Sequence, residues 1–328
     1  MRGVIGARRR LSYAIAVAVW ICPTGSWAQN FPSKSIRYVI PFDPGASPDV
    51  VGRIIADRLT RLWGQQVVVE NRVGAAGTLG SAFVAKSPPD GYTLLQANIA
   101  SNAIAVSLYA KVPYDQLRDF APITRIGMTP NIITGHPSTP FKSIKQLIAY
   151  AKAHPGELSY CAALAGTSPH LSMELLKLQM KFDVVHIPYR IGTQAVTDTI
   201  GGQVPINISN VPVTIGSVQT GRLRALAVTS AQRASLFPDV PTMQESGVPG
   251  FEVNSWYGVV APAGTPVPVL DKLNADFTSV LRMPEVQQRL NEVVMPPAPT
   301  SREEFDQFIR AEIARWAKVI KEAGIPKQ

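Results

Sequence analysis

The stretch Pro41-Phe42-Asp43-Pro44-Gly45-Ala46-Ser47-Pro48-Asp49 joins a short β-type run to an amphipathic helical run. Apolar residues dominate positions 36–40 before it, and from Val50 to Leu62 they recur at the spacing of a helix face. We therefore predict a strand, a turn and a helix. Ser47 is the expected N-cap, Pro48 fits the first helical position because it lacks an N–H group, and Gly64 is expected to end the helix.

This turn contains main-chain donors that the helix itself does not use. They are the N–H groups of Gly45, Ala46, Ser47, Asp49 and Val50. Because the start of a helix carries partial positive charge, such a group of donors favours an anion. The stretch therefore predicts an anion site at the end of the first strand.

A second stretch of the same kind lies far downstream. There the apolar run 158–161 leads into Ala165-Gly166-Thr167-Ser168-Pro169-His170 and then into an apolar-periodic helix. Ser-Pro is also a common way to begin any helix, and this remains the alternative interpretation for each copy. Two copies after strands in different parts of the chain favour one shared site, in which two helix starts face each other.

Residues 1–28 are predicted to form a signal peptide that is cleaved near Ala28. Four arginines precede the apolar residues 11–21, which are too few to span a bilayer, and Ser26-Trp27-Ala28 has the small residues of a cleavage site. Export by the general or the twin-arginine route fits this pattern. No later stretch is long enough for a membrane helix, so no membrane insertion is expected.

Charge and cysteine content narrow the function of the mature chain. Loss of the four leader arginines lowers the formal net charge from +9 to +5. The remaining basic residues are scattered, which argues against nucleic-acid binding and suits an anionic small molecule. Cys161 would be the only cysteine left, so no internal disulfide is expected.

The order of predicted elements indicates two α/β lobes. The chain has 328 residues, of which 46% are hydrophobic, enough for two cores. The first series is strand 36–42, helix 48–63, strand 67–70, helix 78–86 and strand 92–96, a βαβαβ pattern that predicts a parallel sheet with ligands at the carboxyl ends of its strands.

Two long extended segments, 120–136 and 251–262, are predicted to cross between the lobes. The series between them is helix 143–154, strand 158–161, helix 169–180, strand 184–188, helix 193–200, strand 204–209 and strand 223–229. Two helices end the chain, one after Pro266 and one with a capping box from Ser301 to Glu304. Two lobes joined by two crossings predict a hinged protein.

Catalytic signatures are incomplete. Neither His-Glu-x-x-His nor Cys-x-x-Cys occurs, so no metal site is expected. The stretch Gly166–His170 is superficially similar to a nucleophile elbow, but the last position of that motif should be Gly and is His170 here. Gly74–Gly80 has the wrong spacing for a dinucleotide fingerprint. A secreted hydrolase using Ser168 and His170, or a nucleotide-dependent enzyme, remains the alternative from another class.

Four aromatic residues lie at predicted strand ends or crossings: Phe42, Tyr189, Trp256 and Tyr257. Core packing accounts for each of them, and an apolar wall of a ligand cleft is the alternative for one or two.

Several motifs in fixed order resemble one family. They are Pro41-Phe42 with Pro44-Gly45 and Asp49, Val69-Glu70-Asn71-Arg72, Pro89-Asp90-Gly91-Tyr92-Thr93-Leu94, Asp119-Phe120-Ala121-Pro122-Ile123, Gly166-Thr167-Ser168 with His170, His186-Ile187-Pro188-Tyr189, Leu223-Arg224-Ala225-Leu226-Ala227-Val228-Thr229-Ser230, Pro238-Asp239-Val240-Pro241-Thr242, and Gly258-Val259-Val260-Ala261-Pro262-Ala263-Gly264-Thr265-Pro266. The chain from about Phe31 to Gly324 resembles the Bordetella uptake gene family, the extracytoplasmic solute receptors of tripartite tricarboxylate transporters.

The resemblance implies a periplasmic-binding-protein fold of type II, the Venus flytrap. Residues 29–127 plus 253–328 would form the first lobe and residues 128–252 the second. The protein would close on a small carboxylate, either a di- or a tricarboxylate, with an aromatic body as one option. It would then deliver this solute to an inner-membrane permease of one large and one small subunit.

The resemblance also implies which residues bind the solute. They are Phe42, Gly45, Ala46, Ser47 and Asp49 on one lobe, Gly166, Thr167, Ser168 and His170 on the other, and Asn98, Ser101, Ser209 and Asn210 at the sides. In this family the first carboxylate is held by main-chain N–H groups, often through ordered water.

This chain departs from the family pattern where the solute would bind. Asp43 stands where Pro is common, Ala46 where Gly is common, and Pro48 lacks the donor that a Thr would give. Ser209 replaces an acid, which weakens the case for an amino-acid solute because a buried ammonium group needs an anionic partner or several acceptors. Arg190 could pair with a second acid group of the solute or face solvent.

We therefore predict a non-enzymatic, monomeric solute receptor without cofactor or metal. A sensor whose closed form meets a membrane kinase is the remaining alternative, since the sequence does not separate sensing from transport.

Overall fold

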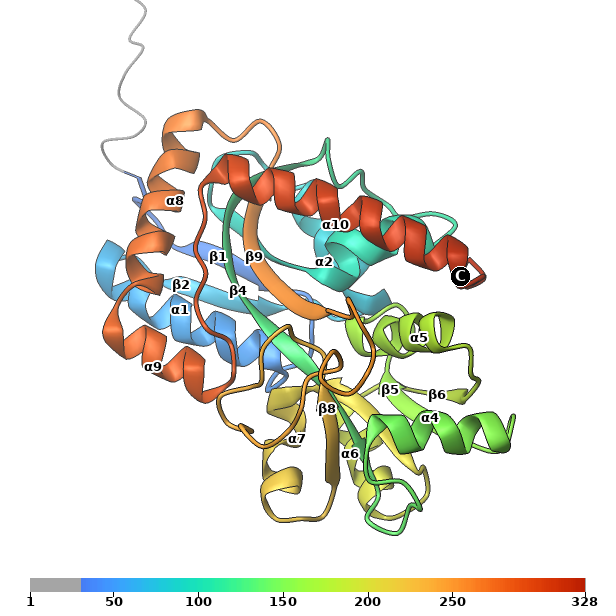
Figure 1. The fold of residues 1–328 in the computed structure, drawn as a ribbon. Helices are drawn as coiled ribbons and strands as arrows, with labels where there is room; N and C mark the ends of the chain where they lie inside the picture. Colours follow the sequence, from blue (N-terminus) through green and yellow to red (C-terminus); the bar gives the residue numbers. More distant parts are fainter. Residues whose placement is uncertain (1–30, 328) are drawn as a thin grey trace, which may run out of the picture.

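The computed structural model of the chain describes residues 31–327 (Figure 1). The predicted signal peptide and its cleavage site near Ala28 lie outside the described residues. The described residues contain no helix that is both long and apolar enough to cross a membrane.

The first lobe is built on three parallel strands. Its elements are β1 (Ile36–Ile40), α1 (Ser47–Trp63), β2 (Val67–Asn71), η1 (Ala75–Gly77), α2 (Thr78–Ala85), β3 (Thr93–Asn98), η2 (Ala100–Ile104) and α3 (Ala105–Leu108). β1 pairs in parallel with both β2 and β3. The predicted βαβαβ unit is confirmed, whereas η2 and α3 were not predicted.

Two long strands connect the lobes. β4 (Phe120–Gly135) and β9 (Asn254–Pro262) pair antiparallel from Phe120 opposite Pro262 to Pro130 opposite Asn254. Figure 1 shows them side by side through the middle of the molecule. Both coincide with predicted crossing segments, but the sequence did not predict that they pair with each other. The predicted lobe boundaries fall inside β4 and just before β9.

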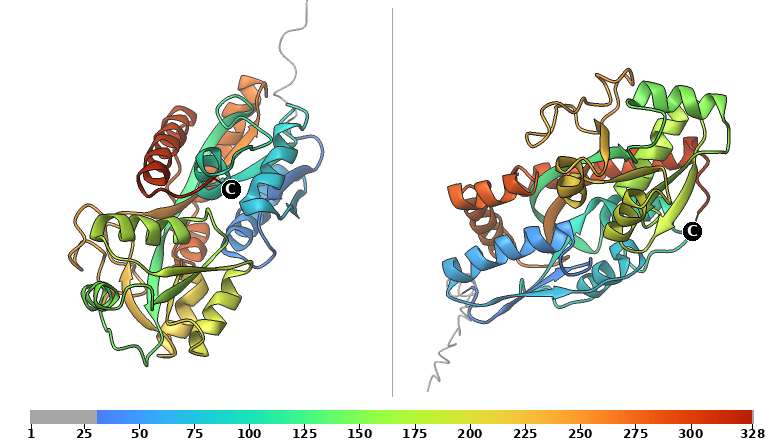
Figure 2. Two further views of the ribbon diagram at one scale, coloured as in Figure 1. Left: turned by 90° about the vertical axis from the view of Figure 1, so that its right-hand side faces the viewer. Right: turned by 90° about the horizontal axis from the view of Figure 1, so that it is seen from below.

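The second lobe continues the sheet beyond β4. Its elements are α4 (Ile144–Ala153), β5 (Ser159–Ala163), α5 (Ser168–Met180), β6 (Val185–Tyr189), α6 (Gly192–Ile200), β7 (Ile206–Asn210), α7 (Val211–Gln219) and β8 (Arg224–Val228). The strand order across both lobes is β2-β1-β3-β9-β4-β7-β5-β6, with β8 paired to β4. In the left-hand view of Figure 2 the green and yellow second lobe lies at one end and the blue and red first lobe at the other.

The chain ends with three helices, where two were predicted. They are α8 (Val267–Leu281), α9 (Pro284–Glu292) and α10 (Arg302–Glu322). The predicted capping box of α10 is present, because Ser301 and Glu304 each accept from the other's main-chain N–H. α9 was not predicted; it is short, and only two residues separate it from α8.

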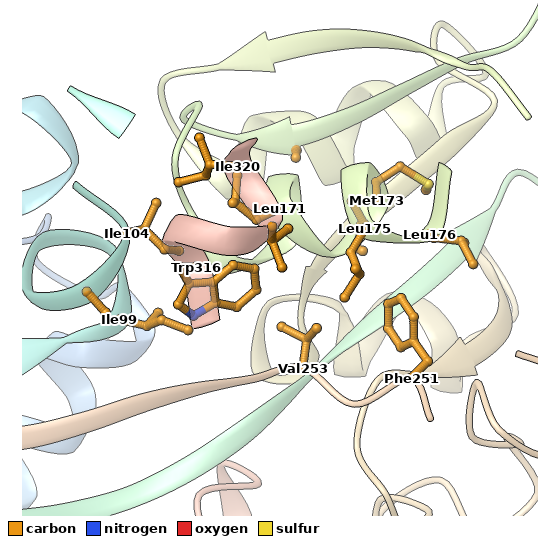
Figure 3. Packing of buried hydrophobic residues seen from close by; sticks show 14 of the residues in the cluster. Ile99, Ile104, Leu171, Met173, Leu175, Leu176, Phe251, Val253, Trp316 and Ile320 are labelled. Atoms are coloured by element: carbon orange, nitrogen blue, oxygen red, sulfur yellow. The ribbon is translucent and has the colours of Figure 1, made fainter. Parts of the chain in front are cut away.

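The largest buried cluster contains residues of both lobes. Figure 3 shows Trp316 and Ile320 of α10 close to Leu171 of α5 and Ile104 of η2. The lobes therefore share apolar packing on this side, in addition to the two connecting strands. Burial of such large side chains contributes about 1.5–3 kcal/mol each.

Candidate functional site

A cavity of about 500 Å³ is lined by residues of both lobes. Nine of the predicted site residues line it: Phe42, Gly45, Ala46, Ser47, Asn98, Thr167, Ser168, Arg190 and Asn210. The volume falls within the range of small-molecule sites. The two predicted anion-binding loops therefore border one space.

The first loop, residues 43–50, leads from β1 into α1. Gly45 has a φ of 78°, and Ala46 is extended with a φ of −67° and a ψ of 159°. Three of the five predicted donors are used within the loop: Gly45 N–H donates to the Asp49 carboxylate (2.9 Å), Ala46 N–H to the Asp43 carbonyl (3.1 Å), and Val50 N–H to the Ala46 carbonyl (3.1 Å). Among residues 31–327, none accepts from the N–H groups of Ser47 and Asp49.

The predicted N-cap at Ser47 is wrong. α1 begins at Ser47, its N-cap is Ala46, and no side chain caps it, so Pro48 is at the second helical position. The Ala46 carbonyl accepts the first helical hydrogen bond, from Val50 N–H, which makes Ala46 the N-cap residue. The predicted end at Gly64 is confirmed, with a φ of 60°.

Asp49 holds the first loop from behind. It is 3% exposed and also accepts from Arg53 Nε (2.9 Å) and Asn71 Nδ2 (2.8 Å). Burial raises its pKa, but the hydrogen bonds from Arg53, Gly45 and Asn71 outweigh burial and hold the pKa below its usual range. Asp49 is therefore an ionised acceptor that fixes the loop without lining the cavity.

The second loop, residues 164–171, leads from β5 into α5 and has the same backbone pattern. Gly166 has a φ of 82°, and Thr167 is extended with a φ of −88° and a ψ of 162°. Gly166 N–H donates to His170 Nδ1 (3.3 Å), Thr167 N–H to the Leu164 carbonyl (3.2 Å), and Leu171 N–H to the Thr167 carbonyl (3.0 Å). In the described part of the chain, the N–H groups of Ser168 and His170 have no acceptor.

His170 takes the place that Asp49 has in the first loop. It is 6% exposed and packs on the His186 ring with centroids 4.3 Å apart. Burial, with a smaller effect of Lys177, lowers the pKa of His170 to about 4. The imidazole is therefore neutral near pH 7, as it must be for Nδ1 to accept from Gly166.

Five predicted site residues do not line the cavity: Asp49, Ser101, Gly166, His170 and Ser209. Ser101 is fully buried and accepts from Asn98 Nδ2 (2.8 Å), and Ser209 donates to Asn207 Oδ1 (3.0 Å). These residues support the cavity wall from behind.

The aromatic residues divide in the same way. Phe42 and Tyr257 line the cavity, whereas the Tyr189 hydroxyl donates to Asp198 (2.7 Å) and Trp256 Nε1 donates to Glu312 (3.0 Å). Burial raises the pKa of Tyr257 to about 12, against a smaller opposing effect of the nearby Ser47 hydroxyl. Ser47 Oγ is itself buried without a hydrogen bond of normal geometry.

Two further helix starts border the cavity. α6 begins beside Ile191, and α7 begins beside Asn210 with Pro212 at its second position. α7 was not predicted, although Asn210-Val211-Pro212 carries a start signal of the Ser-Pro type. None of α1, α5, α6 and α7 has a side-chain cap, whereas α4 and α10, which begin elsewhere, are capped by serines.

The electrostatics of the cavity depend mainly on these helix starts. Asp43 and Arg190, both exposed, are the lining residues that carry formal charge near neutral pH, and their charges cancel. The uncapped N-termini leave partial positive charge. Within residues 31–327, no group of three or more His, Cys, Asp or Glu side chains could hold a metal ion.

The two enzyme alternatives gain no support from the geometry. The Ser168 hydroxyl is bonded to Asn131 Oδ1 and contacts Ser255 Oγ, and no described hydrogen bond joins it to His170. Gly77 and Gly80 pack closely on Pro41, and the stretch Gly74–Gly80 contributes no residue to the cavity lining.

Residues 51–325 match the model of a family described as the tripartite tricarboxylate transporter family receptor. The UPF0065 protein in the tcbD-tcbE intergenic region of Pseudomonas sp. (strain P51) is 38% identical over 96% of this chain and 94% of that protein. Protein BugT of Bordetella pertussis is 37% identical over 90% of this chain and 91% of its own length.

Solved structures agree with the fold. R. palustris Rpa4515 with adipate has a TM-score of 0.85 at 36% identity and covers 90% of this chain and 99% of that chain. MatC (Rpa3494) from Rhodopseudomonas palustris with bound malate has a TM-score of 0.79 at 31% identity and covers 88% of this chain and 100% of that chain. The predicted two-lobed α/β fold is confirmed.

Proposed function

Because the chain belongs to the tripartite tricarboxylate transporter receptor family, we propose that it captures a small carboxylate in the periplasm and delivers it to a membrane permease of one large and one small subunit. It does so without catalysing a reaction. The solute is a di- or tricarboxylate held in the cavity between the lobes.

One observation carries this proposal. The first and second loops come from different lobes, yet both begin helices at the same cavity, and each leaves main-chain N–H groups without a described acceptor. A carboxylate that receives such N–H groups gains charge-assisted hydrogen bonds. Because Asp43 and Arg190 cancel, the attraction comes from main-chain dipoles rather than from net side-chain charge.

Binding by both lobes also supplies a reason for closure. A solute that contacts the first and the second loop at once binds the closed arrangement more tightly than any open one, and therefore shifts the population toward it. The proteins with adipate and malate support small dicarboxylates as the first candidates.

The direct test is thermal unfolding of protein freed of bound solute, with succinate, adipate, malate and citrate. Each acid is paired with its neutral amide, which has the same shape but no negative charge. An acid at 100 times its dissociation constant should add about 2.7 kcal/mol to the free energy of unfolding, and its amide should add almost nothing. Failure of every acid to stabilise the protein would exclude carboxylate binding.

The permease step has a separate test. Solute-loaded protein should be retained by membranes that contain the two-subunit permease more strongly than solute-free protein. Equal retention by membranes without the permease would contradict delivery and leave carboxylate binding untouched.

A further inference from the structure

A chain of hydrogen bonds behind the second loop fixes the orientation of one buried side-chain amide. The Ser172 hydroxyl donates to the main-chain carbonyl of Ser168 (2.8 Å), so its oxygen is left as an acceptor. That oxygen faces the Asn131 amide at 3.0 Å, and the group there must therefore be the donor Nδ2. Asn131 Oδ1 consequently points to the other side.

The same logic fixes Asn210 on the neighbouring strand. Asn131 Oδ1 can only accept, and it does so from Asn210 Nδ2 at 2.8 Å. The second proton of Asn210 Nδ2 goes to Ser255 Oγ at 2.7 Å. Both protons of this amide are committed, and Asn210 Oδ1 is left as an acceptor.

Asn210 Oδ1 has no donor among the described residues. Asn210 is the N-cap residue of α7, where an Asn oxygen usually accepts from the second or third helical N–H, yet it makes no such bond. The second helical residue is Pro212, which has no N–H to give. Because Asn210 lines the cavity, its free acceptor is available to a solute.

From this geometry we propose that Asn210 Oδ1 determines specificity by accepting a hydrogen bond from a hydroxyl group beside the carboxylate of the solute. The preferred solutes are then hydroxycarboxylates. This inference rests on the proposed carboxylate-binding function. The acceptor belongs to the same cluster as Ser168, whose main-chain N–H is one of the free donors, so hydroxyl and carboxylate are recognised side by side.

A hydroxyl group fits this place better than an ammonium group. The residues hydrogen-bonded in the same cluster as Asn210 are all neutral: Asn131, Ser168 and Ser255. Ser209, its neighbour in the chain, is neutral too, and the one acid that lines the cavity, Asp43, is exposed and belongs to the other lobe. An ammonium group that loses its water needs an anionic partner or several acceptors. One amide oxygen is enough for a hydroxyl donor.

The test compares matched solutes that differ in one group. Calorimetry measures the dissociation constants of succinate against malate, propionate against lactate, and phenylacetate against mandelate, with aspartate as the ammonium analogue of malate. In each pair that binds, the hydroxy acid should bind about tenfold more tightly, because the deoxy acid leaves the acceptor unpaired. Asn210→Leu should bring the ratio close to one. Asn291→Leu, the same change at an exposed position of α9, should leave the ratio unchanged.

The outcomes separate this inference from the proposed function. Equal binding within every pair in the unaltered protein overturns the hydroxycarboxylate preference while carboxylate binding stands, and so does tighter binding of aspartate than of malate. If no acid binds at all, the proposed function fails and this inference fails with it. Should Asn210→Leu not fold, the ratios in the unaltered protein still decide.

Discussion

The first loop (residues 43–50) and the second loop (residues 164–171) have one backbone pattern and two different chemistries. In each, a glycine with positive φ donates its N–H to the side chain four residues later, and an extended residue precedes the helix. That side chain is the carboxylate of Asp49 in the first loop and the neutral imidazole of His170 in the second. The loop geometry therefore requires an acceptor at this position, but not a charge.

The serines at the two helix starts also differ. Ser47 Oγ is buried near the Tyr257 hydroxyl and makes no hydrogen bond of normal geometry, whereas Ser168 Oγ is bonded to Asn131. The first loop therefore offers a solute its main-chain N–H groups, because the Ser47 hydroxyl oxygen is buried. The second loop offers its main-chain groups and relies on Asn131 and Asn210 for its side-chain chemistry.

The largest effect is expected from removing one free amide in each loop. Ser47→Pro and Ser168→Pro each delete an N–H group at the first helical position, where proline is tolerated. Each should weaken binding of a carboxylate about 100-fold, the equivalent of about 2.8 kcal/mol, because a hydrogen bond to a charged group is lost. Calorimetry measures this. Ser47→Ala, which keeps the amide, is the control and should cost only a few-fold.

If only one proline variant weakens carboxylate binding, a single loop holds the anion, and the two loops do not have the same function. Unfolding in urea without solute checks that both variants remain folded.

The pH dependence of stability distinguishes the two loop acceptors, the carboxylate of Asp49 and the imidazole of His170. His170 titrates near 6.5 in the unfolded chain and at about 4 in the folded protein, so only the unfolded chain takes up its proton between these values. Stability is therefore lost as the pH falls from about 6.5 toward 4, by about 1.4 kcal/mol per pH unit for this imidazole. His186, whose pKa burial also lowers to about 4, adds a slope of the same sign. Urea unfolding at pH 7, 6 and 5 should show the combined slope, and His170→Gln should reduce it by the share of one imidazole.

Asp49 behaves differently, because its pKa is lowered and it stays ionised in both states over this range. Its contribution is lost only as the pH falls below the usual range of a carboxyl group. Asp49→Asn should consequently lower stability by the same amount at pH 7 and pH 5. An unchanged slope in His170→Gln would contradict the assignment of the proton uptake to the second loop.

The smallest effect concerns the two glycines. A Cβ on Gly45 would meet no atom within 4 Å, whereas a Cβ on Gly166 would lie 2.6 Å from Leu108 Cδ2. Gly45→Ala should cost about 1 kcal/mol of stability through its positive φ, and Gly166→Ala about 1 kcal/mol more through the clash. Urea midpoints measure both. Gly156→Ala is the control for φ alone, because Gly156 has a φ of 79° and a Cβ there would meet no atom within 4 Å. Equal losses of stability at Gly45 and Gly166 would mean that the contact with Leu108 costs nothing.

Much of the fold could be predicted because its signals are local. The periodicity of α1, the capping box of α10 and the alternation of strands with helices depend on residues a few positions apart, which act in the same way in any tertiary context. α7 was missed because its apolar positions give weak periodicity, and α9 because it is short and follows α8 after only two residues.

The candidate site could be predicted only in outline. Local sequence placed Ser47 and Ser168 at two helix starts, and the structure brings both to one cavity. The local sequence could not show that Asp49 and His170 support the loops from behind, because the directions of these side chains depend on their contacts with Asn71 and His186.

By itself, the sequence determined the two strand-to-helix turns, their order along the chain and the resemblance to solute receptors, since each depends on neighbouring residues. Only the tertiary structure decided which donors and acceptors remain free. Asn210 shows why: its partners Asn131 and Ser255 lie 79 and 45 positions away in the chain. A hydrogen bond commits a proton only when folding brings its two groups within about 3 Å, and no local pattern contains that distance.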